Sequence, residues 1–565
     1  MATQRGVTAS AAAGVPRSLR RLSSRARRYL AASTPPVPRE ALLCATVAAI
    51  LAALLAWLGP PGTDFAAHLY QRTLFLRHGF TLWDDFWYAG RYSFIDYSLL
   101  YYPLATALGI RLLAVATVAV ATLAFAVVTT REWGSLSRWS TRSFAVVWAG
   151  FLISAAFPFV LGVALALLAL WALQAGHRWR FTALTLFTLA ASPVALVLLV
   201  VVLAGVALAR HDAPRRMAVP AIALTAAIGI ELVLMRLFPG TGRYPYPASE
   251  AAVALGFCLV GVACTWRVER ARVLRYVFAV YAAANLAVYL VPSGLGDNVG
   301  RLRYIAVPLV LLIVALRHWR PLPPMLAVVG LALAWNVTPL AAGLVNYESD
   351  VGARAAVWRP ALDYLHGHLS HGYRVEAVDT IEHWPAYYLA ESGIPIVRGW
   401  FRQDDFPFNA PLYGKLRPAA YRRWLRELGV AYVVLTRTPP DYSSRQEAAL
   451  VRSGRAGLRR VWTSREISIY AVPRPRPIVT GPDRPVLLAL HQSRLVVRVR
   501  RGGTYHLAVR WTPYWHASTG CLARTANGML RLRTRGAADV RIVFDVDASS
   551  LLDALGGFTP ACAGR

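Results

Sequence analysis

Long apolar runs alternate with short polar loops through residues 41–346 of the chain. A helix that crosses a membrane needs about 20 apolar residues, and tilted or paired helices can be shorter. On this basis we predict about eleven spans and a polytopic α-helical membrane protein. The predicted spans are 41–58, 105–129, 144–157, 159–175, 181–193, 194–209, 218–238, 250–267, 273–291, 304–317 and 322–345.

Two of the long apolar stretches contain a proline, at Phe157-Pro158 and at Ser192-Pro193. Each stretch is either one kinked span or a hairpin of two short spans. The hairpin interpretation places every basic loop on the same side of the membrane, as the positive-inside rule requires. These loops are 131–142, 177–180, 210–216, 267–275 and 317–320.

The same rule predicts how the chain is oriented in the plasma membrane. The basic tail 1–40 is expected in the cytoplasm, and the part after residue 346 is expected outside the cell membrane. The first span, 41–58, lacks a small-residue cleavage site and is followed by further spans, so we expect it to be a span rather than a removable signal peptide. Residues 41–346 are then the transmembrane part.

The pattern becomes that of soluble domains after residue 346. Residues 347–473 mix predicted helices with short predicted strands, which indicates an α/β domain. The helices are 353–369 and 419–428, and the strands are 375–378, 431–435 and 467–472. Residues 474–565 alternate apolar and polar positions in runs separated by turn residues, which is typical of a β-sandwich. Such a sandwich often serves as a carbohydrate-binding module on membrane enzymes, although fold alone does not prove that function.

Composition agrees with a membrane protein rather than a soluble enzyme. Hydrophobic residues make up 56% of the chain, and the mean hydropathy is +0.42. The net charge of +32 could suggest a nucleic-acid partner, but no nucleic-acid-binding motif is present and much of the charge follows membrane topology. We therefore expect a lipid bilayer and no nucleic acid around this protein.

The five cysteines divide between the two predicted compartments. Cys44, Cys258 and Cys264 lie in predicted spans, where thiols usually serve as packing residues. Cys521 and Cys562 lie in the predicted sandwich, and an oxidising compartment favours a disulfide between them. No cysteine spacing typical of zinc is present.

The polar loop 59–103 after the first span holds the densest set of chemically active side chains. Thr63 or Asp64 can begin a helix that ends near Gly79. Asp64, His68 and Arg72 recur every four residues and would share one face of that helix. They are candidates for catalysis (Asp64, His68) and substrate binding (Arg72). The alternative is that Asp64 only caps the helix and His68 is an ordinary surface residue.

The second half of this loop combines aromatic rings with charged groups. Indole and phenol rings stack on sugars, and carboxylates bind sugar hydroxyls. The candidate residues are Trp83, Asp84, Asp85, Trp87, Tyr88 and Arg91. The alternative for the tryptophans is an aromatic belt at the membrane surface, which would not account for the two aspartates.

Three further segments are candidates for substrate binding. Asn298, Arg301 and Arg303 precede a span at the depth of a lipid phosphate, which arginine binds bidentately; ordinary headgroup contact is the alternative. The segment 399–409 contributes Trp400, Gln403 and Asp404, and WTPYWH at 511–516 is a second aromatic cluster. These two segments either line a groove for an acceptor glycan or attach the C-terminal part to the membrane part.

The first loop resembles that of the GT-C superfamily of membrane glycosyltransferases. The residues that carry the resemblance are Asp64, His68, Gly79, Trp83, Trp87, Gly90, Tyr102 and Pro103. The chain also resembles bacterial membrane proteins described as 6-pyruvoyl-tetrahydropterin-synthase-related or YfhO-like. The stretches RGWFRQDDFPFN and YRRWLRELGVAYVVL are similar to ectodomain segments of actinobacterial members. Many GT-C members have a pair of acids early in this loop, whereas here Asp64 stands alone and Asp84-Asp85 follow later.

The resemblance implies an enzyme that transfers a sugar, mannose or arabinofuranose, from a polyprenyl phosphate to a cell-envelope glycan or glycolipid. Asp64 would be the base, with Asp84 as the alternative, and Arg301 or Arg303 would stabilise the departing phosphate. The sequence requires no cofactor, although Asp64, Asp84 or Asp85 could hold a divalent metal.

Two other functions stay open at this point. A transporter or flippase of lipid-linked precursors would need charged residues inside the spans, which hold few besides Arg111, Glu231 and Arg236. A non-catalytic envelope scaffold that binds glycans would not depend on Asp64.

Overall fold

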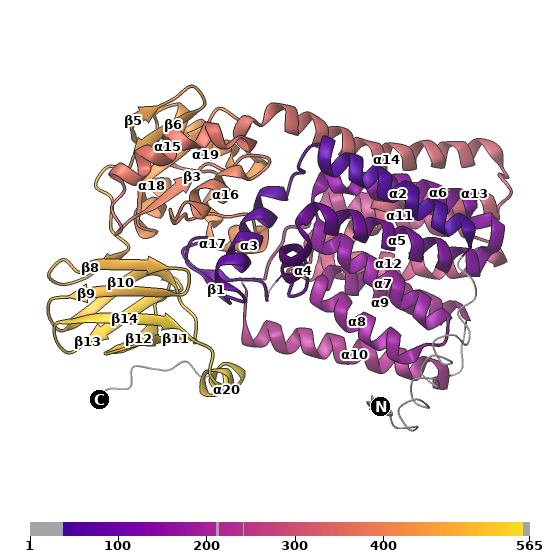
Figure 1. Cartoon of the computed structure of the whole chain (residues 1–565), viewed down its shortest axis with the longest axis horizontal. Helices are drawn as coiled ribbons and strands as arrows, with labels where there is room; N and C mark the ends of the chain where they lie inside the picture. The colour runs from indigo at the N-terminus through magenta and orange to yellow at the C-terminus, as the bar shows by residue number, and fades with distance from the viewer. Residues whose placement is uncertain (1–37, 96, 211–213, 241, 558–565) are drawn as a thin grey trace, which may run out of the picture.

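The computed structural model describes residues 38–95, 97–210, 214–240 and 242–557. Long helices lie side by side in one half of the molecule, and the C-terminal sheets lie beyond one end of this bundle (Figure 1). The first loop occupies the space between the two halves. The structure therefore has the predicted architecture of a polytopic helical membrane protein with a C-terminal α/β and β-sandwich part.

Each of the eleven predicted spans corresponds to a separate helix. The helices are α2 (Arg39–Leu58), α5 (Ile110–Trp133), α6 (Arg138–Gly150), α7 (Phe157–Gln174), α8 (Arg178–Ala191), α9 (Pro193–Arg210), α10 (Pro214–Leu237), α11 (Ala248–Thr265), α12 (Arg272–Leu290), α13 (Ala306–Leu316) and α14 (Leu322–Ser349). The hairpin interpretation of both proline-containing stretches agrees with these boundaries, because α7 and α9 each begin at their proline or one residue before it.

Within the described residues, nine stretches are long and apolar enough to cross a membrane. This number is smaller than eleven for two reasons. The stretch Ile110–Ser154 counts once, although Gly134, with φ of +61°, ends α5 and starts a turn into α6. Helix α8 is only 14 residues long, which is too short by itself for an untilted crossing.

The first loop folds into α3 (Phe65–His78), the short strands β1 (Trp83–Asp84) and β2 (Arg91–Tyr92), and α4 (Tyr101–Leu108). Helix α3 begins and ends where the sequence predicts, after Asp64 and before Gly79. Strands β1 and β2 pair antiparallel, so the loop doubles back on itself between the bundle and the C-terminal sheets.

The α/β domain contains one four-stranded sheet in the order β3-β4-β6-β5. Strands β3 and β4 are parallel and the other pairs are antiparallel. The elements are α15 (Ala355–His368), β3 (Arg374–Ala377), α16 (Trp384–Glu391), α17 (Arg402–Phe408), α18 (Pro418–Glu427), β4 (Val430–Thr436), α19 (Arg445–Arg452), β5 (Arg459–Thr463) and β6 (Ile467–Ala471). Helices α16, α17 and α19 and strand β5 were not predicted from the sequence, because each is too short to show a clear periodicity.

The sandwich consists of two four-stranded sheets with the orders β12-β13-β10-β7 and β11-β14-β9-β8. Its elements are β7 (Val479–Thr480), β8 (Val486–His491), β9 (Arg494–Val499), β10 (Gly503–Arg510), β11 (Trp515–Ala517), β12 (Cys521–Arg524), β13 (Met529–Thr534), β14 (Ala538–Phe544) and α20 (Ala548–Gly556). Residues 1–37 and Cys562 lie outside the described residues, so the cytoplasmic tail and the disulfide between Cys521 and Cys562 stay predictions.

Aromatic residues of the first loop join the bundle to both C-terminal domains. The Trp83 ring stacks on Phe544 of the sandwich, with ring centres 5.4 Å apart. The Trp87 indole donates a hydrogen bond to the carbonyl of Ala386 in the α/β domain at 3.0 Å. From the other side, the Tyr514 hydroxyl donates to the carbonyl of Leu237 in α10 at 2.7 Å. Of the two interpretations of the cluster at 511–516, the structure therefore favours attachment to the membrane part.

Candidate functional site

Asp64 lies at the start of α3, at the boundary between the bundle and the α/β domain. Its carboxylate makes no capping hydrogen bond with its own helix. Instead, carboxylate Oδ1 accepts a hydrogen bond from the Trp400 indole at 2.7 Å. Both side chains are partly exposed. Asp64 is therefore more than the simple helix cap that the sequence left open as an alternative.

Aromatic rings surround this hydrogen bond. The centre of the Trp400 ring lies 5.1 Å from that of Tyr97 and 5.3 Å from that of His68. His68 is fully buried, and its Nδ1 lies 3.1 Å from the Tyr102 hydroxyl. Burial lowers the pKa of His68 to about 3, so the imidazole is neutral at physiological pH. His68 thus packs against Trp400, the residue that binds Asp64.

Three positive side chains act on the Asp64 carboxyl. Burial raises its pKa, whereas the charges of His383, Arg301 and Arg402 and the Trp400 hydrogen bond oppose that rise. The carboxylate is thus held between cations from the bundle and cations from the α/β domain. A carboxylate whose pKa is raised is a stronger base than an ordinary aspartate, which suits it to accept a proton.

The two cations of the α/β domain are fixed by buried carboxylates. His383 Nδ1 lies 2.7 Å from Asp379 Oδ2. Burial lowers the pKa of His383, but Asp379 more than offsets this effect, and the pKa of His383 is raised. Arg402 pairs with Asp441, with 2.7 Å between the guanidinium and the carboxylate.

The cation on the bundle side comes from the 3-10 helix η4 (Gly296–Ile305). Arg301 donates to the Asn298 side chain and lies over the Phe159 ring, 4.8 Å from its centre. Arg303 is instead paired with Glu250 at 2.5 Å. Of the two arginines predicted to bind phosphate, Arg301 is the one that acts electrostatically on Asp64.

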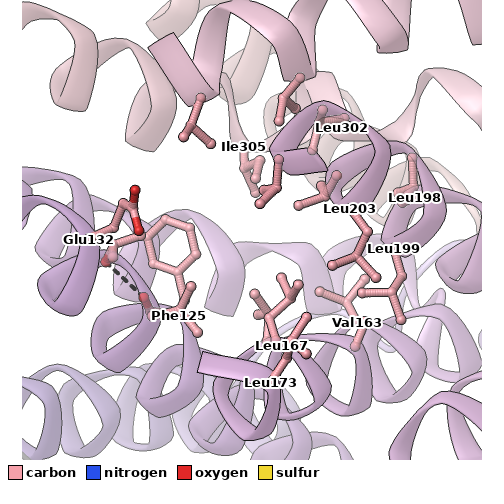
Figure 2. Close-up of a pocket in the computed structure, with 18 of the residues that line it drawn as sticks. Phe125, Glu132, Val163, Leu167, Leu173, Leu198, Leu199, Leu203, Leu302 and Ile305 are labelled. Carbon is pink, nitrogen blue, oxygen red and sulfur yellow. Dashed lines mark hydrogen bonds between the residues drawn. The ribbon is translucent and has the colours of Figure 1, made fainter. Parts of the chain in front are cut away.

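Arg301 also lines one end of an apolar cavity of about 500 Å³ inside the helix bundle. Leucine and valine side chains from α7 and α9, among them Val163, Leu167, Leu199 and Leu203, surround this space (Figure 2). The ion pair between Glu132 and Arg210, at the last turns of α5 and α9, lines it as well. The cavity thus combines an apolar wall with a cation whose charge acts on Asp64.

The paired aspartates of the first loop are placed differently from Asp64. Asp84 and Asp85 are fully buried. Asp84 accepts hydrogen bonds from the Tyr70 hydroxyl and the Phe86 amide, each at 3.0 Å, and Asp85 accepts one from the Trp83 indole at 2.8 Å. Burial raises the pKa of Asp84 to about 6 and that of Asp85 well above its ordinary value. The structure does not bring either carboxyl into the set of charges that acts on Asp64.

The other predicted sugar-binding residues of the first loop are also enclosed. Trp83, Trp87, Tyr88 and Arg91 are buried against the C-terminal domains. Arg91 forms an ion pair with Asp404 at 2.7 Å. Asp404 was also predicted to bind substrate, so two predicted binding residues bind each other. These side chains hold the domains together in this structure, because none of them presents a free face to a substrate.

Two predicted binding residues remain to be placed. The Arg72 guanidinium donates to the carbonyl of Ala105 at 2.8 Å and so turns toward α4, away from the Asp64 carboxylate. Gln403 is partly exposed beside Arg402. Among the predicted residues in 399–409, Trp400 is the one with a hydrogen bond to Asp64 in the described part of the chain.

Several residues near Asp64 escaped the sequence analysis as individual candidates. Asp379, Arg402 and Asp441 carry no local motif, and the fold of the α/β domain brings them together from distant positions. Tyr97 belongs to the aromatic first loop but has no spacing that distinguishes it from its neighbours. Its raised pKa, caused first by burial and then by Asp64, reflects its place beside that carboxyl.

The described part of the chain contains no group of three or more His, Cys, Asp or Glu side chains that could hold a metal ion. Both oxygens of Asp84 accept hydrogen bonds, whereas only Oδ1 of Asp85 does so among the described residues. A divalent metal at Asp64, Asp84 or Asp85 stays a prediction from the sequence.

Fold and site together define a multi-pass membrane protein whose candidate site lies between the helix bundle and an attached α/β domain. No family model matches the chain, and no curated protein matches it. Arabinofuranosyltransferase AftD from Mycobacteria is similar over 83% of this chain and 42% of its own, at 18% identity and a TM-score of 0.47. The oligosaccharyltransferase of Archaeoglobus fulgidus is similar over 70% of this chain and 68% of its own, at 14% identity and a TM-score of 0.34.

This chain thus spans less than half the length of the AftD chain. Both names are those of glycosyltransferases.

Proposed function

We propose that this protein is a membrane glycosyltransferase that transfers a sugar from a polyprenyl-phosphate donor to a cell-envelope glycan or glycolipid. One observation carries the proposal. A partly exposed carboxylate, Asp64, lies under the influence of Arg301, which lines an apolar cavity, and of two cations of the α/β domain. A lipid-linked anionic donor and a hydroxyl acceptor would meet at such a boundary.

The cavity supports the choice of a lipid-linked donor. Its wall consists of apolar side chains from several bundle helices, and burying an alkyl chain contributes about 0.8 kcal/mol per CH₂ group. Arg301 at its end supplies the charge that a phosphate oxygen requires, and a guanidinium can bind it through two N–H groups. A prenyl chain in the cavity would therefore place its phosphate close to Asp64.

In the proposed reaction, the Asp64 carboxylate accepts the proton of the acceptor hydroxyl while that oxygen attacks the anomeric carbon of the sugar. The bond between the anomeric carbon and the phosphate oxygen breaks, and the lipid phosphate leaves with the electron pair. Arg301 stabilises the negative charge that develops on the phosphate. Proton, sugar and electron pair are thereby accounted for without a nucleotide.

The proposal is tested with the full chain in lipid nanodiscs, a panel of radiolabelled polyprenyl-phosphate sugars and envelope glycan acceptors. A labelled acceptor is the expected product, and the productive donor identifies the sugar. Movement of donor across a bilayer without transfer would indicate a transporter, and acceptor binding without transfer would indicate a scaffold. Either result, obtained with well-folded protein, contradicts the proposal.

The Arg301→Gln variant should transfer sugar about 100-fold more slowly, because it lacks the charge that stabilises the leaving phosphate. The measurement is kcat at saturating donor. Arg236→Gln is the control, since Arg236 lies near the same end of the bundle and donates to the Leu555 carbonyl of α20. Equal values of kcat for the two variants would show that Arg301 does not stabilise the leaving phosphate.

Filling the cavity should weaken donor binding. In the double variant Leu167→Trp and Leu203→Trp, both indoles enter the space shown in Figure 2. Displacing about two CH₂ groups of the chain corresponds to roughly a tenfold rise in KM for a long-chain donor. A short-chain donor should be unaffected. Ile222→Trp, on the exposed face of α10, is the control, and a KM that changes equally in both would contradict a chain-binding cavity.

A further inference from the structure

The side chain of Asp64 does not cap the helix that it precedes. An aspartate before the first residue of a helix normally accepts a hydrogen bond from a backbone N–H of the first turn. Asp64 has φ and ψ angles of −93° and 6°, and its carboxylate makes no such hydrogen bond. The carboxylate oxygen Oδ1 accepts from Trp400 Nε1 at 2.7 Å instead. The hydrogen bond that orients Asp64 thus comes from another domain.

Trp400 is itself held firmly in place. Its ring meets Tyr97 edge-on at 88°, and its centre lies 4.7 Å from that of Phe401. The preceding Gly399 packs so closely on the first loop that a Cβ atom would lie 2.8 Å from the Tyr88 ring and 2.9 Å from the Trp87 ring. A glycine is therefore needed at position 399 for the chain to deliver Trp400 to Asp64.

The second oxygen of Asp64, Oδ2, has no hydrogen-bond partner among the residues that the structure describes, and the side chain is partly exposed. The two oxygens are thus in different situations, one bound by an indole and one open. We propose that Trp400 is a positioning residue for Asp64, which binds Oδ1 and leaves Oδ2 for the acceptor hydroxyl. This inference rests on the proposed function, because it takes Asp64 as the base.

The proposal changes the role predicted for Trp400 from sugar binding to orientation of the base. It also makes the base depend on docking of the α/β domain, since the indole donor comes from that domain. The electrostatics agree with this role. The Trp400 hydrogen bond lowers the pKa of Asp64 against the larger effect of burial, which raises it. Loss of the bond should therefore raise the pKa of Asp64 further.

The test compares Trp400→Phe with Trp358→Phe in the full chain in nanodiscs. Both changes remove an indole N–H from the α/β domain, but Trp358 donates to the Gly352 carbonyl and not to a carboxylate. Trp400→Phe should lower kcat about tenfold with KM changed less than twofold, a loss similar to that of one charge-assisted hydrogen bond. The acid limb of its kcat profile should move to higher pH, because the base is protonated there more readily.

The control should keep the wild-type pH profile whatever its stability. Equal kcat values in the two variants, or a Trp400→Phe loss without a shift of the acid limb, would overturn the proposal. Asp64→Asn, measured in parallel, separates this failure from failure of the proposed function. If Asp64→Asn retains transfer, the base itself is misassigned; if it loses transfer while Trp400→Phe behaves like Trp358→Phe, only the role of Trp400 is wrong.

Discussion

Replacing Asp64 with asparagine should lower the rate of sugar transfer by about 10²- to 10⁴-fold, the range for removal of a general base. The amide has nearly the same shape as the carboxylate and can still accept the Trp400 hydrogen bond through its oxygen. The lost property is the ability to take a proton from the acceptor hydroxyl. The measurement is kcat with the productive donor, together with the thermal unfolding midpoint of each protein.

Asp84→Asn is the informative comparison, because Asp84 is the other base that the sequence offers. Its carboxylate is buried and already accepts from Tyr70 and from the Phe86 amide. We expect Asp84→Asn to affect mainly the stability of the first loop. If transfer is lost in Asp84→Asn at unchanged stability and retained in Asp64→Asn, the base assignment is contradicted.

The same carboxyl determines the expected pH dependence. A base acts in its deprotonated form, so activity falls as the pH drops through its pKa. An ordinary aspartate has a pKa of about 3.9, and burial raises that of Asp64. The acid limb of kcat/KM should therefore lie at a higher pH than that of an exposed aspartate, and Asp64→Asn should abolish it.

Replacing Arg398 with methionine should destabilise the α/β domain by about 3–5 kcal/mol, the usual effect of breaking a buried ion pair from one side. Arg398 is buried and binds both oxygens of Asp405, at 3.2 and 2.7 Å. It also lies 3.4 Å from Glu447 and donates to Ser443 at 2.9 Å. Methionine fills similar space but removes the cation that binds both oxygens of Asp405 and lies beside Glu447.

This effect is measured by thermal or denaturant unfolding of the full chain, with unfolding of the α/β domain detected by its proteolysis. The control is Arg498→Met, which removes an exposed ion pair with Asp539 on the sandwich surface. Solvent screens such a pair, so this variant should unfold almost like the wild type. Equal destabilisation of the two variants would show that the buried cluster around Arg398 is not a stabilising centre.

The sequence by itself determined the features that depend on neighbouring residues. Apolar length placed the bundle helices, and the turn residue Gly79 placed the end of α3. Period-two alternation placed long sandwich strands such as β9 and β13. Each of these follows from local periodicity, which a chain carries whatever its tertiary structure. Local patterning also singled out Asp64 and Trp400 as separate candidates.

Tertiary structure alone decided which of these candidates meet. The sequence offers both Asp64 and Asp84 as the base, and local pattern does not determine which of the two the fold buries. The fold buries Asp84 beneath Tyr70 and leaves Asp64 partly exposed beside Trp400. The same holds for the pair of His383 with Asp379. Burial and contact between distant segments arise from the packing of whole domains, and a carboxyl's hydrogen bonds and pKa follow from that packing rather than from its neighbours in the chain.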